Sequence, residues 1–219
     1  MLRVALTGGL GAGKSTAGKL FEALGAVVLS SDEMGRELMQ PGQAVYRAIL
    51  ERFGSEVLLP DGHLNRGALA RIAFADARVE ELNAIVHPAV IKRQAEVIQA
   101  IAKKDSETIV MVESALIFET KYGGDVGWRQ RFDKVILVTA PDELKVARFV
   151  ARAAKATVLG PAERDALAAE AWRRLAQQIP DEKKASLSDY VLTNDGPPTE
   201  LEWQVDHLWP ILRADARKS

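Results

Sequence analysis

The sequence contains no cysteine, and this absence removes several kinds of chemistry at once. Without thiols the chain cannot form a disulfide framework, a thiolate zinc site or a cysteine nucleophile. A large net charge is also lacking, because 29 Lys and Arg residues against 30 Asp and Glu residues leave a formal net charge of -1. This balance gives no support to a protein that coats nucleic acid or a membrane surface, so any basic site must be local.

Long hydrophobic runs are missing as well. The N-terminal stretch "MLRVALTGG" runs into glycines and is too short for a signal-peptide core or a membrane span. We therefore expect a cytoplasmic protein without a membrane partner. Its 219 residues, of which 47% are hydrophobic, can bury one good core and a small appended subdomain.

Five short apolar runs rich in β-branched residues predict buried strands, at residues 2–7, 26–30, 108–113, 134–139 and 190–193. Helical patterns lie between them, for example at residues 15–24, 88–103 and 142–154. Alternating strands and helices are typical of a parallel sheet covered on both faces. We therefore predict an α/β fold of about five strands.

Two helical insertions are expected in this sheet. Residues 39–104 are too many for one crossover helix, so we expect a helical insertion there. A Pro-Asp-Gly turn within it is followed by Asn65 or a neighbour as the expected helix cap. Pro88 is expected in the first turn of a further helix. Residues 148–184 are rich in alanine and arginine and are broken by Gly160-Pro161, which favours a mobile helical flap.

The last predicted helix carries apolar residues at helical spacing: Leu201, Val205, Leu208 and Leu212. The simplest interpretation of Trp203 and Trp209 in this helix is that both are packing residues.

The stretch "LTGGLGAGKST", residues 6–16, matches the pattern G-x-x-x-x-G-K-[ST] through Gly8, Gly13, Lys14 and Ser15. It follows a predicted strand and precedes a predicted helix. Glycines let the backbone turn its N–H groups inward, where they and the helix N-terminus bind the β-phosphate of a nucleotide. Lys14 is expected to reach the β- and γ-phosphates, and the Ser15 hydroxyl to ligate Mg²⁺. The alternative, a glycine-rich turn with an accidental Lys-Ser, is rare by chance.

The segment "SSDEMGREL" places Asp32 after the second predicted strand, at the sheet edge that must hold the phosphate loop. A carboxylate there can orient and deprotonate an acceptor hydroxyl in line with the γ-phosphate. Position alone equally allows Asp32 to be a helix N-cap with Arg36 as an ion-pair partner one turn later.

Two further absences narrow the class of nucleotide-binding protein. The N-K-x-D segment with which GTPases read guanine is missing, and no basic stripe with interleaved aromatics indicates nucleic acid. A small-molecule phosphotransferase without a nucleic-acid partner is the leading class.

Seven segments resemble the dephospho-CoA kinase family in order and approximate spacing: "ALTGGLGAGKST", "LSSDEMGREL", "FGSEVL", "DGHLNRGAL", "LNAIVHPAV", "SALIFET" and "SDYVLTNDG". The resemblance implies ATP-dependent phosphorylation of the ribose 3′-hydroxyl of dephospho-CoA, the last step of coenzyme A synthesis, with Mg²⁺. It also implies a three-layer P-loop fold with a five-stranded parallel sheet, in which one kinase domain (1–219) contains a helical substrate insertion (39–104) and a lid (148–184). We expect a monomer or a weak homo-oligomer.

The resemblance also implies roles for individual residues. Catalytic roles fall to Asp32, Lys14 and Arg148. ATP-binding roles fall to Gly11, Ala12, Gly13, Lys14, Ser15, Thr16, Arg148, Arg152, Asn194 and Gly196. Substrate-binding roles fall to Asp32, Arg36, Arg66, His87 and Pro88.

Structural alternatives stay open for several of these residues. Arg66 can be a surface cap or ion-pair residue, His87 a hydrogen-bonded core histidine, and Arg148 with Arg152 a solvated basic face. Glu113 is either a carboxylate near the metal or an ordinary acidic strand end.

In the lid, Arg174 with Gln178 resembles the closing segment, and Arg173 is the alternative match. The chain also departs from the family pattern, with Ser30-Ser31-Asp32 for the usual Asp-Ala-Asp, Ala115 for a proline and Ala153 for an aspartate. A kinase for another nucleoside and a nucleotide-switched binding protein are the alternative functions.

Overall fold

The computed structural model describes residues 1–75, 78–120, 127–156 and 158–218, without the side chains of residues 66, 70, 73–75 and 156. Its strands are β1 Leu2–Thr7, β2 Val27–Ser30, β3 Ile109–Glu113, β4 Lys134–Thr139 and β5 Tyr190–Thr193. Its helices are α1 Lys14–Ala23, α2 Ser31–Leu38, α3 Ala44–Phe53, α4 Arg66–Ala75, α5 Val79–Ala102, α6 Asp142–Ala156, α7 Pro161–Ala176, α8 Asp181–Leu187 and α9 Pro198–Ala216, with short 3₁₀ turns at Ser55–Val57 and Trp128–Gln130.

The described residues form two compact units. Met1–Leu29, Ile101–Glu119 and Trp128–Ser219 make the first unit, and Ser30–Ala100 with Thr120–Gly127 make the second. We describe each unit by itself.

The five strands form one sheet with the order β2-β3-β1-β4-β5. β1 pairs in parallel with β3 and β4, and β4 pairs in parallel with β5. The predicted α/β fold with a five-stranded parallel sheet is therefore confirmed, and each predicted strand is present. Parallel strands end at one edge, which brings together the ends of β1, β3, β4 and β5 at Thr7, Glu113, Thr139 and Thr193.

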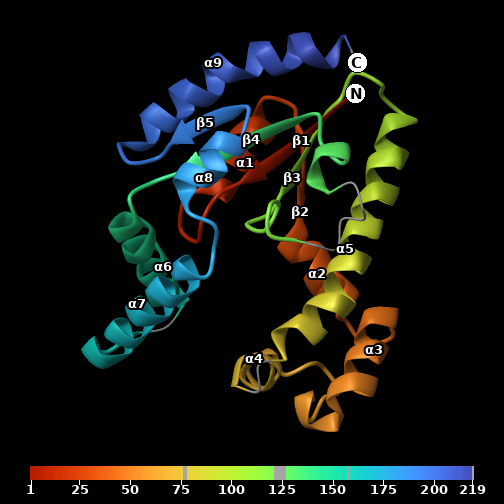
Figure 1. Ribbon diagram of the computed structural model, residues 1–219, viewed down its shortest axis with the longest axis vertical. Coiled ribbons are helices and arrows are strands. Elements are labelled where there is room, and N and C mark those ends of the chain that lie inside the picture. Colours follow the sequence, from red (N-terminus) through yellow and green to blue (C-terminus); the bar gives the residue numbers. More distant parts are fainter. Residues whose placement is uncertain (76–77, 121–126, 157, 219) are drawn as a thin grey trace. The chain divides into compact units, whose positions relative to one another are not determined.

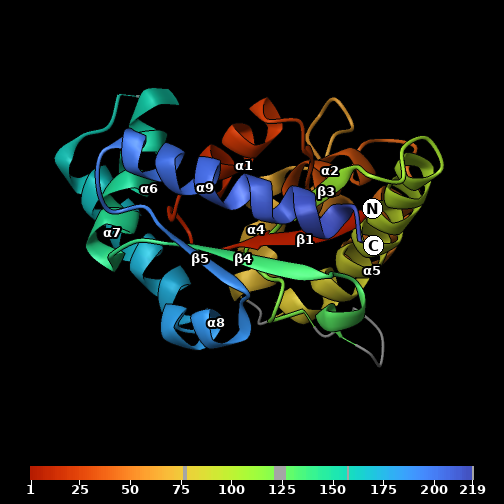
Figure 2. The same ribbon diagram turned by 90° about the horizontal axis from the view of Figure 1, so that it is seen from above.

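Helices cover both faces of this sheet, as the apolar strands require. Figure 2 shows α1 and α9 over one face and α8 over the other. Residues from α1, α9 and the strands share one buried core, in which Phe21 packs against Trp209 with ring centroids 6.4 Å apart.

The interpretation of Trp203 as a packing residue is wrong. Its side chain is 61% exposed and stacks on the ring of His207. The buried stripe of α9 runs through Leu201 and Val205, and a residue two positions after Leu201 lies about 200° around a helix from it. Trp203 therefore faces solvent, whereas Trp209 is partly buried against the core as expected.

The expected break at Gly160-Pro161 separates two helices, α6 and α7, which lie side by side (Figure 1). Pro161 is the first residue of α7, where a missing N–H costs nothing, and the Glu163 carboxylate accepts a hydrogen bond from the Gly160 N–H at 2.8 Å. The helical character of this segment is as predicted, and its function as a lid remains a prediction.

The second unit contains α2 to most of α5 around its own apolar cluster, which includes Ile49, Phe53, Val57 and Leu69. Asn65 caps α4, because its Oδ1 accepts a hydrogen bond from the Ala68 N–H at 3.0 Å. The cap predicted after the Pro-Asp-Gly turn is thus present.

The expectation that Pro88 opens a helix is wrong, because α5 begins at Val79 and contains Pro88 in its interior. A proline there leaves the carbonyl four residues earlier, at Ala84, without its helical donor. The helix continues through Pro88 because Leu82, Ile85, Val86 and Ala89 pack on the apolar cluster of the second unit, and Glu80 and Glu81 suit its first turn.

Candidate functional site

The glycine-rich loop joins β1 to α1 and takes backbone conformations that favour glycine. Gly11 and Gly13 have φ of 73° and 103°. A Cβ atom on Gly11 would lie 2.2 Å from the carbonyl oxygen of Lys145, and one on Gly13 would lie 2.0 Å from Nδ2 of Asn194. Glycine at these two positions therefore lets neighbouring segments approach the loop backbone closely.

We expect the Gly11→Ala variant to lose about 1–3 kcal/mol of unfolding free energy and to bind ATP more weakly, because alanine adds both backbone strain and a clash. Gly25→Ala is the matched control, since Gly25 has φ of 106° but nothing within 4 Å of an added Cβ. Denaturant unfolding and ATP titration of both variants measure the difference. Equal losses of stability with unchanged ATP affinity would contradict the assigned role of the loop.

The Lys14 side chain folds back over this loop. Its Nζ donates hydrogen bonds to the carbonyl oxygens of Gly8 at 2.9 Å and Gly9 at 3.0 Å. Lys14 is also the first residue of α1, so the loop that its ammonium contacts leads directly into the N-terminus of that helix. The loop therefore presents a cation and a helix N-terminus together, which suits a bound phosphate.

The Ser15 hydroxyl donates a hydrogen bond of 2.6 Å to Oε1 of Glu113, the last residue of β3. A hydroxyl and a carboxylate are hard oxygen donors of the kind that Mg²⁺ prefers. The described part of the chain contains no cluster of three or more His, Asp or Glu side chains that could hold a metal ion. This is compatible with Mg²⁺, which usually takes one or two protein ligands and completes its shell with water and substrate phosphates.

Asn194, after β5, connects the phosphate loop with α6. Its Nδ2 donates to the Ala12 carbonyl at 2.8 Å, and its own backbone N–H donates to the Thr139 carbonyl at 2.8 Å. Nη1 of Arg148 donates to the Asn194 carbonyl at 2.8 Å. The structure thus brings together Ala12, Arg148 and Asn194, and Arg148 is not part of a solvated basic face. Gly196 lies two residues further along the same loop.

One arginine from α6 and one from α7 lie against the ring of Phe149. The guanidinium carbons of Arg152 and Arg174 lie 5.8 Å and 5.7 Å from its centroid. Nε of Arg174 donates to Glu170 at 2.7 Å, and this hydrogen bond is the main reason that the pKa of Glu170 lies below its usual value. Arg173 also contacts Glu170. Of the two residues that matched the closing segment, Arg174 is the one beside Phe149.

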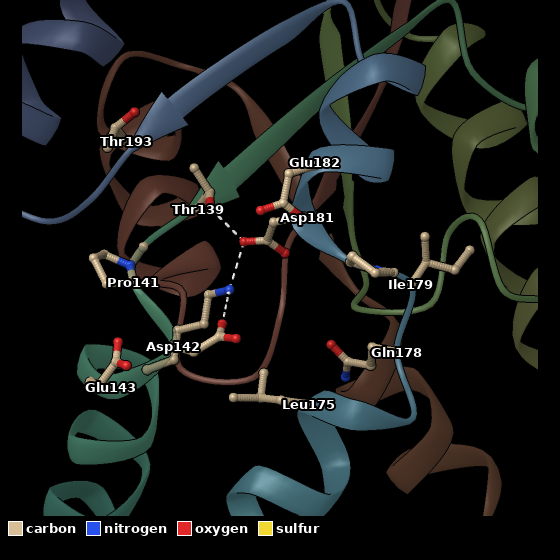
Figure 3. Close-up of a pocket in the computed structure, with 13 residues that line it drawn as sticks. Thr139, Pro141, Asp142, Glu143, Leu175, Gln178, Ile179, Asp181, Glu182 and Thr193 are labelled. Carbon is tan, nitrogen blue, oxygen red and sulfur yellow. Dashed lines mark hydrogen bonds and ion pairs between the residues drawn. The ribbon is translucent and has the colours of Figure 1, made fainter.

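A cavity of about 470 Å³ lies at the base of these helices, between α6, α8 and the ends of β4 and β5 (Figure 3). Within it, Nζ of the buried Lys145 donates to Asp142 at 2.8 Å and to Asp181 at 2.6 Å. Asp181 also accepts a hydrogen bond from the Thr139 hydroxyl. Burial lowers the pKa of Lys145, but the bonds and charges of both carboxylates outweigh it and raise the pKa, so the ammonium stays charged.

Sequence reasoning missed Lys145. Its Asp142 partner, three residues earlier on α6, is a readable signal, but Asp181 lies 36 residues away. The Lys145 ammonium holds the first turns of α6 and α8 near the end of β4, and the Lys145 carbonyl packs on Gly11 of the phosphate loop.

In the second unit, Asp32 lies in the first turn of α2 and is exposed. The N-cap is Ser30, whose Oγ accepts a hydrogen bond from the Glu33 N–H at 3.2 Å. Asp32 and Arg36 are both described residues, and they form no ion pair with each other. The alternative of Asp32 as an N-cap paired with Arg36 is therefore wrong, while its role as a base stays a prediction.

His87 and Pro88 lie together on α5. Nδ1 of His87 is 3.3 Å from the Thr120 hydroxyl, and burial lowers the pKa of His87. The structure therefore contains the hydrogen-bonded histidine of the structural alternative, which does not test contact with substrate. Arg66 begins α4, and its side chain lies outside the described residues.

The lowered pKa of His87 predicts how stability depends on pH. In the unfolded chain a histidine titrates near about pH 6.5, above the value in the folded protein. As the pH falls below about 6.5, the unfolded chain binds a proton at His87 before the folded protein does, so the free energy of unfolding falls. Replacing His87 by Asn should make this decline shallower in denaturant unfolding between about pH 7.5 and about pH 5. Identical slopes for both proteins would contradict the buried neutral histidine.

The family model for dephospho-CoA kinase matches residues 2–200, which includes the phosphate loop, α2, the His87 segment and the loop after β5. The chain belongs to the dephospho-CoA kinase family. A dephospho-CoA kinase from Geobacter sulfurreducens is 38% identical over 208 residues, covering 94% of this chain and 96% of that protein.

Two solved structures are also similar. TT1252 from Thermus thermophilus has a TM-score of 0.71 and 29% identity, over 96% of this chain and 97% of that chain. A dephospho-CoA kinase from Campylobacter jejuni has a TM-score of 0.66 at 20% identity, over 97% of this chain and 98% of that chain, and this likeness shows the shared fold.

The residues predicted to bind ATP and those predicted to bind the acceptor of this dephospho-CoA kinase family member lie in different units. Those predicted to bind ATP lie in the first unit, whereas those predicted to bind the acceptor, from Asp32 to Pro88, lie in the second unit. Among the helices of the described residues, none has the length and apolar character needed to cross a bilayer.

Proposed function

We propose that this protein transfers the γ-phosphoryl group of ATP to the ribose 3′-hydroxyl of dephospho-CoA, which yields coenzyme A and ADP. The observation that carries the proposal is the phosphate loop, with Lys14 over it and Ser15 bonded to Glu113, in a chain that matches the family over residues 2–200. We further propose that the protein acts in the cytoplasm, as a monomer or weak homo-oligomer, without a nucleic-acid partner.

The first unit supplies the ATP site in this proposal. The N–H groups from Gly11 to Thr16 bind the phosphates, and the Lys14 ammonium turns from the loop carbonyls to the β- and γ-phosphates. Ser15 and Glu113 would hold Mg²⁺, which neutralises negative charge on the phosphates.

Asn194 and Gly196 border the adenine, where backbone groups read the base. Arg148, which donates to the Asn194 carbonyl, and Arg152, one turn later on α6, would bind the phosphates of ATP. A planar guanidinium stabilises the charge that spreads over the transferring phosphoryl group.

The second unit supplies the acceptor site. Asp32 orients the 3′-hydroxyl and takes its proton, and Arg36, Arg66, His87 and Pro88 bind the rest of dephospho-CoA. Closure of the lid, residues 148–184, excludes the water that would otherwise compete as acceptor.

The test is ADP formation from ATP and Mg²⁺ with and without dephospho-CoA, combined with mass spectrometry of the acceptor. We expect dephospho-CoA to accelerate ADP release strongly and to gain one phosphoryl group. Coenzyme A is the matched control acceptor, because its 3′ position is already phosphorylated. Slow ADP release that ignores dephospho-CoA would overturn the proposal, and a panel of other nucleosides and nucleotides would then identify the acceptor class.

A further inference from the structure

Three side chains of α5 spaced by four residues, Val86, Val90 and Gln94, support the buried side of α2. A Cβ atom built on Gly35 of α2 would lie 3.7 Å from Cγ2 of Val90 and 3.9 Å from Cγ1 of Val86. One turn before Gly35 on α2, Oγ of Ser31 accepts a hydrogen bond of 2.9 Å from Nε2 of Gln94. α2 therefore rests on α5 at two points, Gly35 and Ser31.

The Gln94 amide is an unusual group for this position. The residue is only 3% exposed, while its counterparts one and two turns earlier on α5 are valines. Burying an amide costs free energy unless it is hydrogen-bonded, so an apolar side chain would pack here more simply. What the amide adds is direction, because its hydrogen bond to Ser31 depends on angle as well as distance.

The direction matters because of the residues that follow the two contact points. Asp32 follows Ser31 and Arg36 follows Gly35, so both lie about 100° around α2 from the face that touches α5. Both are exposed. The two contacts together hold the rotation of α2 about its own axis, and this rotation decides where Asp32 and Arg36 point.

We propose that Gln94 is a positioning residue for the catalytic carboxylate: its hydrogen bond to Ser31 holds α2 in the rotation that aims Asp32 at the acceptor hydroxyl. The proposal rests on the function proposed above, in which Asp32 is the base.

The first variant is Gln94→Met, which keeps the length of the side chain and removes the donor. We expect kcat with dephospho-CoA to fall about 10- to 100-fold, the usual effect of a small displacement of a reacting group. KM for ATP should remain unchanged, because the phosphate loop belongs to the other unit. Gln99→Met is the matched control, with the same substitution at an exposed position of α5, and it should leave kcat unchanged.

The double variant Gln94→Met/Ser31→Ala separates positioning from packing. Removing both polar partners leaves no orphaned hydroxyl, so the unfolding midpoint should return towards that of wild type. If the hydrogen bond positions Asp32, kcat stays low in this stable protein. Recovery of kcat together with stability would overturn the proposal, because the pair would then serve packing alone.

A readout independent of activity distinguishes this inference from the proposed function. Hydrogen exchange of the backbone amides in residues 30–38 should be faster in the double variant than in wild type at equal overall stability. Unchanged exchange would overturn the positioning role. A wild-type protein that does not phosphorylate dephospho-CoA would overturn the proposed function, while faster exchange in the double variant would still support the control of α2 by Gln94.

Discussion

We expect Lys14→Met to lower kcat by about 10²–10³-fold and to weaken ATP binding at the same time. The Lys14 ammonium already lies at the phosphate loop, held by the carbonyls of Gly8 and Gly9 at 2.9 Å and 3.0 Å. Phosphate oxygens would replace these neutral acceptors, and their negative charge adds a direct attraction to the ammonium beyond the hydrogen bonds themselves. Methionine keeps most of the length of the side chain and loses the charge, so both effects follow from one missing cation.

Single-turnover kinetics and ATP titration measure the two effects of Lys14→Met separately. Lys19→Met is the matched control, since Lys19 is exposed on the same helix, one turn beyond the loop. It should behave as wild type. If Lys14→Met retained both ATP affinity and rate, the assignment of the phosphate loop would be wrong.

The Asp32→Asn variant should lose about 10²–10⁴-fold in kcat and keep its ATP affinity. Asparagine has nearly the same size, so α2 and its Ser30 cap are preserved, but the amide cannot accept the proton of the acceptor hydroxyl. ATP binding should survive because the phosphate loop lies in the first unit and Asp32 in the second.

Glu33→Gln is the control for Asp32→Asn. Asp32 and Glu33 are the two acidic residues of the first turn of α2, and each stabilises the helix N-terminus by about 0.3–1 kcal/mol. A loss of this electrostatic contribution alone would lower stability equally in both variants and leave kcat intact in both. Turnover of Asp32→Asn near that of wild type would remove Asp32 from the catalytic role.

Much of the fold and the phosphate loop could be predicted from the local chemistry of the sequence. Apolar β-branched runs between helical patterns predicted the strands of a parallel sheet. The Pro-Asp-Gly turn predicted a helix cap at Asn65 or a neighbour, and Asn65 is the cap of α4. The glycine pattern identified the phosphate loop, because the chemistry of that loop depends on backbone conformation, which the residue type controls directly.

Prediction failed where a local signal had more than one structural solution. Pro88 is typical of a first helical turn, but the packing of Leu82, Ile85 and Ala89 against the second unit's apolar cluster, on both sides of Pro88, favours one helix through it. Trp203 looked like a core residue because aromatics usually pack, yet the buried stripe of α9 already fills the core side of that helix.

The sequence by itself therefore determined the strands of the sheet, the phosphate loop and the family. Each strand and each family motif is a short stretch of neighbouring residues, so its pattern can be recognised without the tertiary structure. Only the tertiary structure decided which side chains meet: Ser15 and Glu113 are 98 residues apart, Gln94 and Ser31 are 63 apart, and Lys145 and Asp181 are 36 apart. Periodicity and motif spacing report on neighbours within one element. Pairs such as these form because the order of strands and the packing of helices fold distant segments onto one another, and neither is written in any single segment.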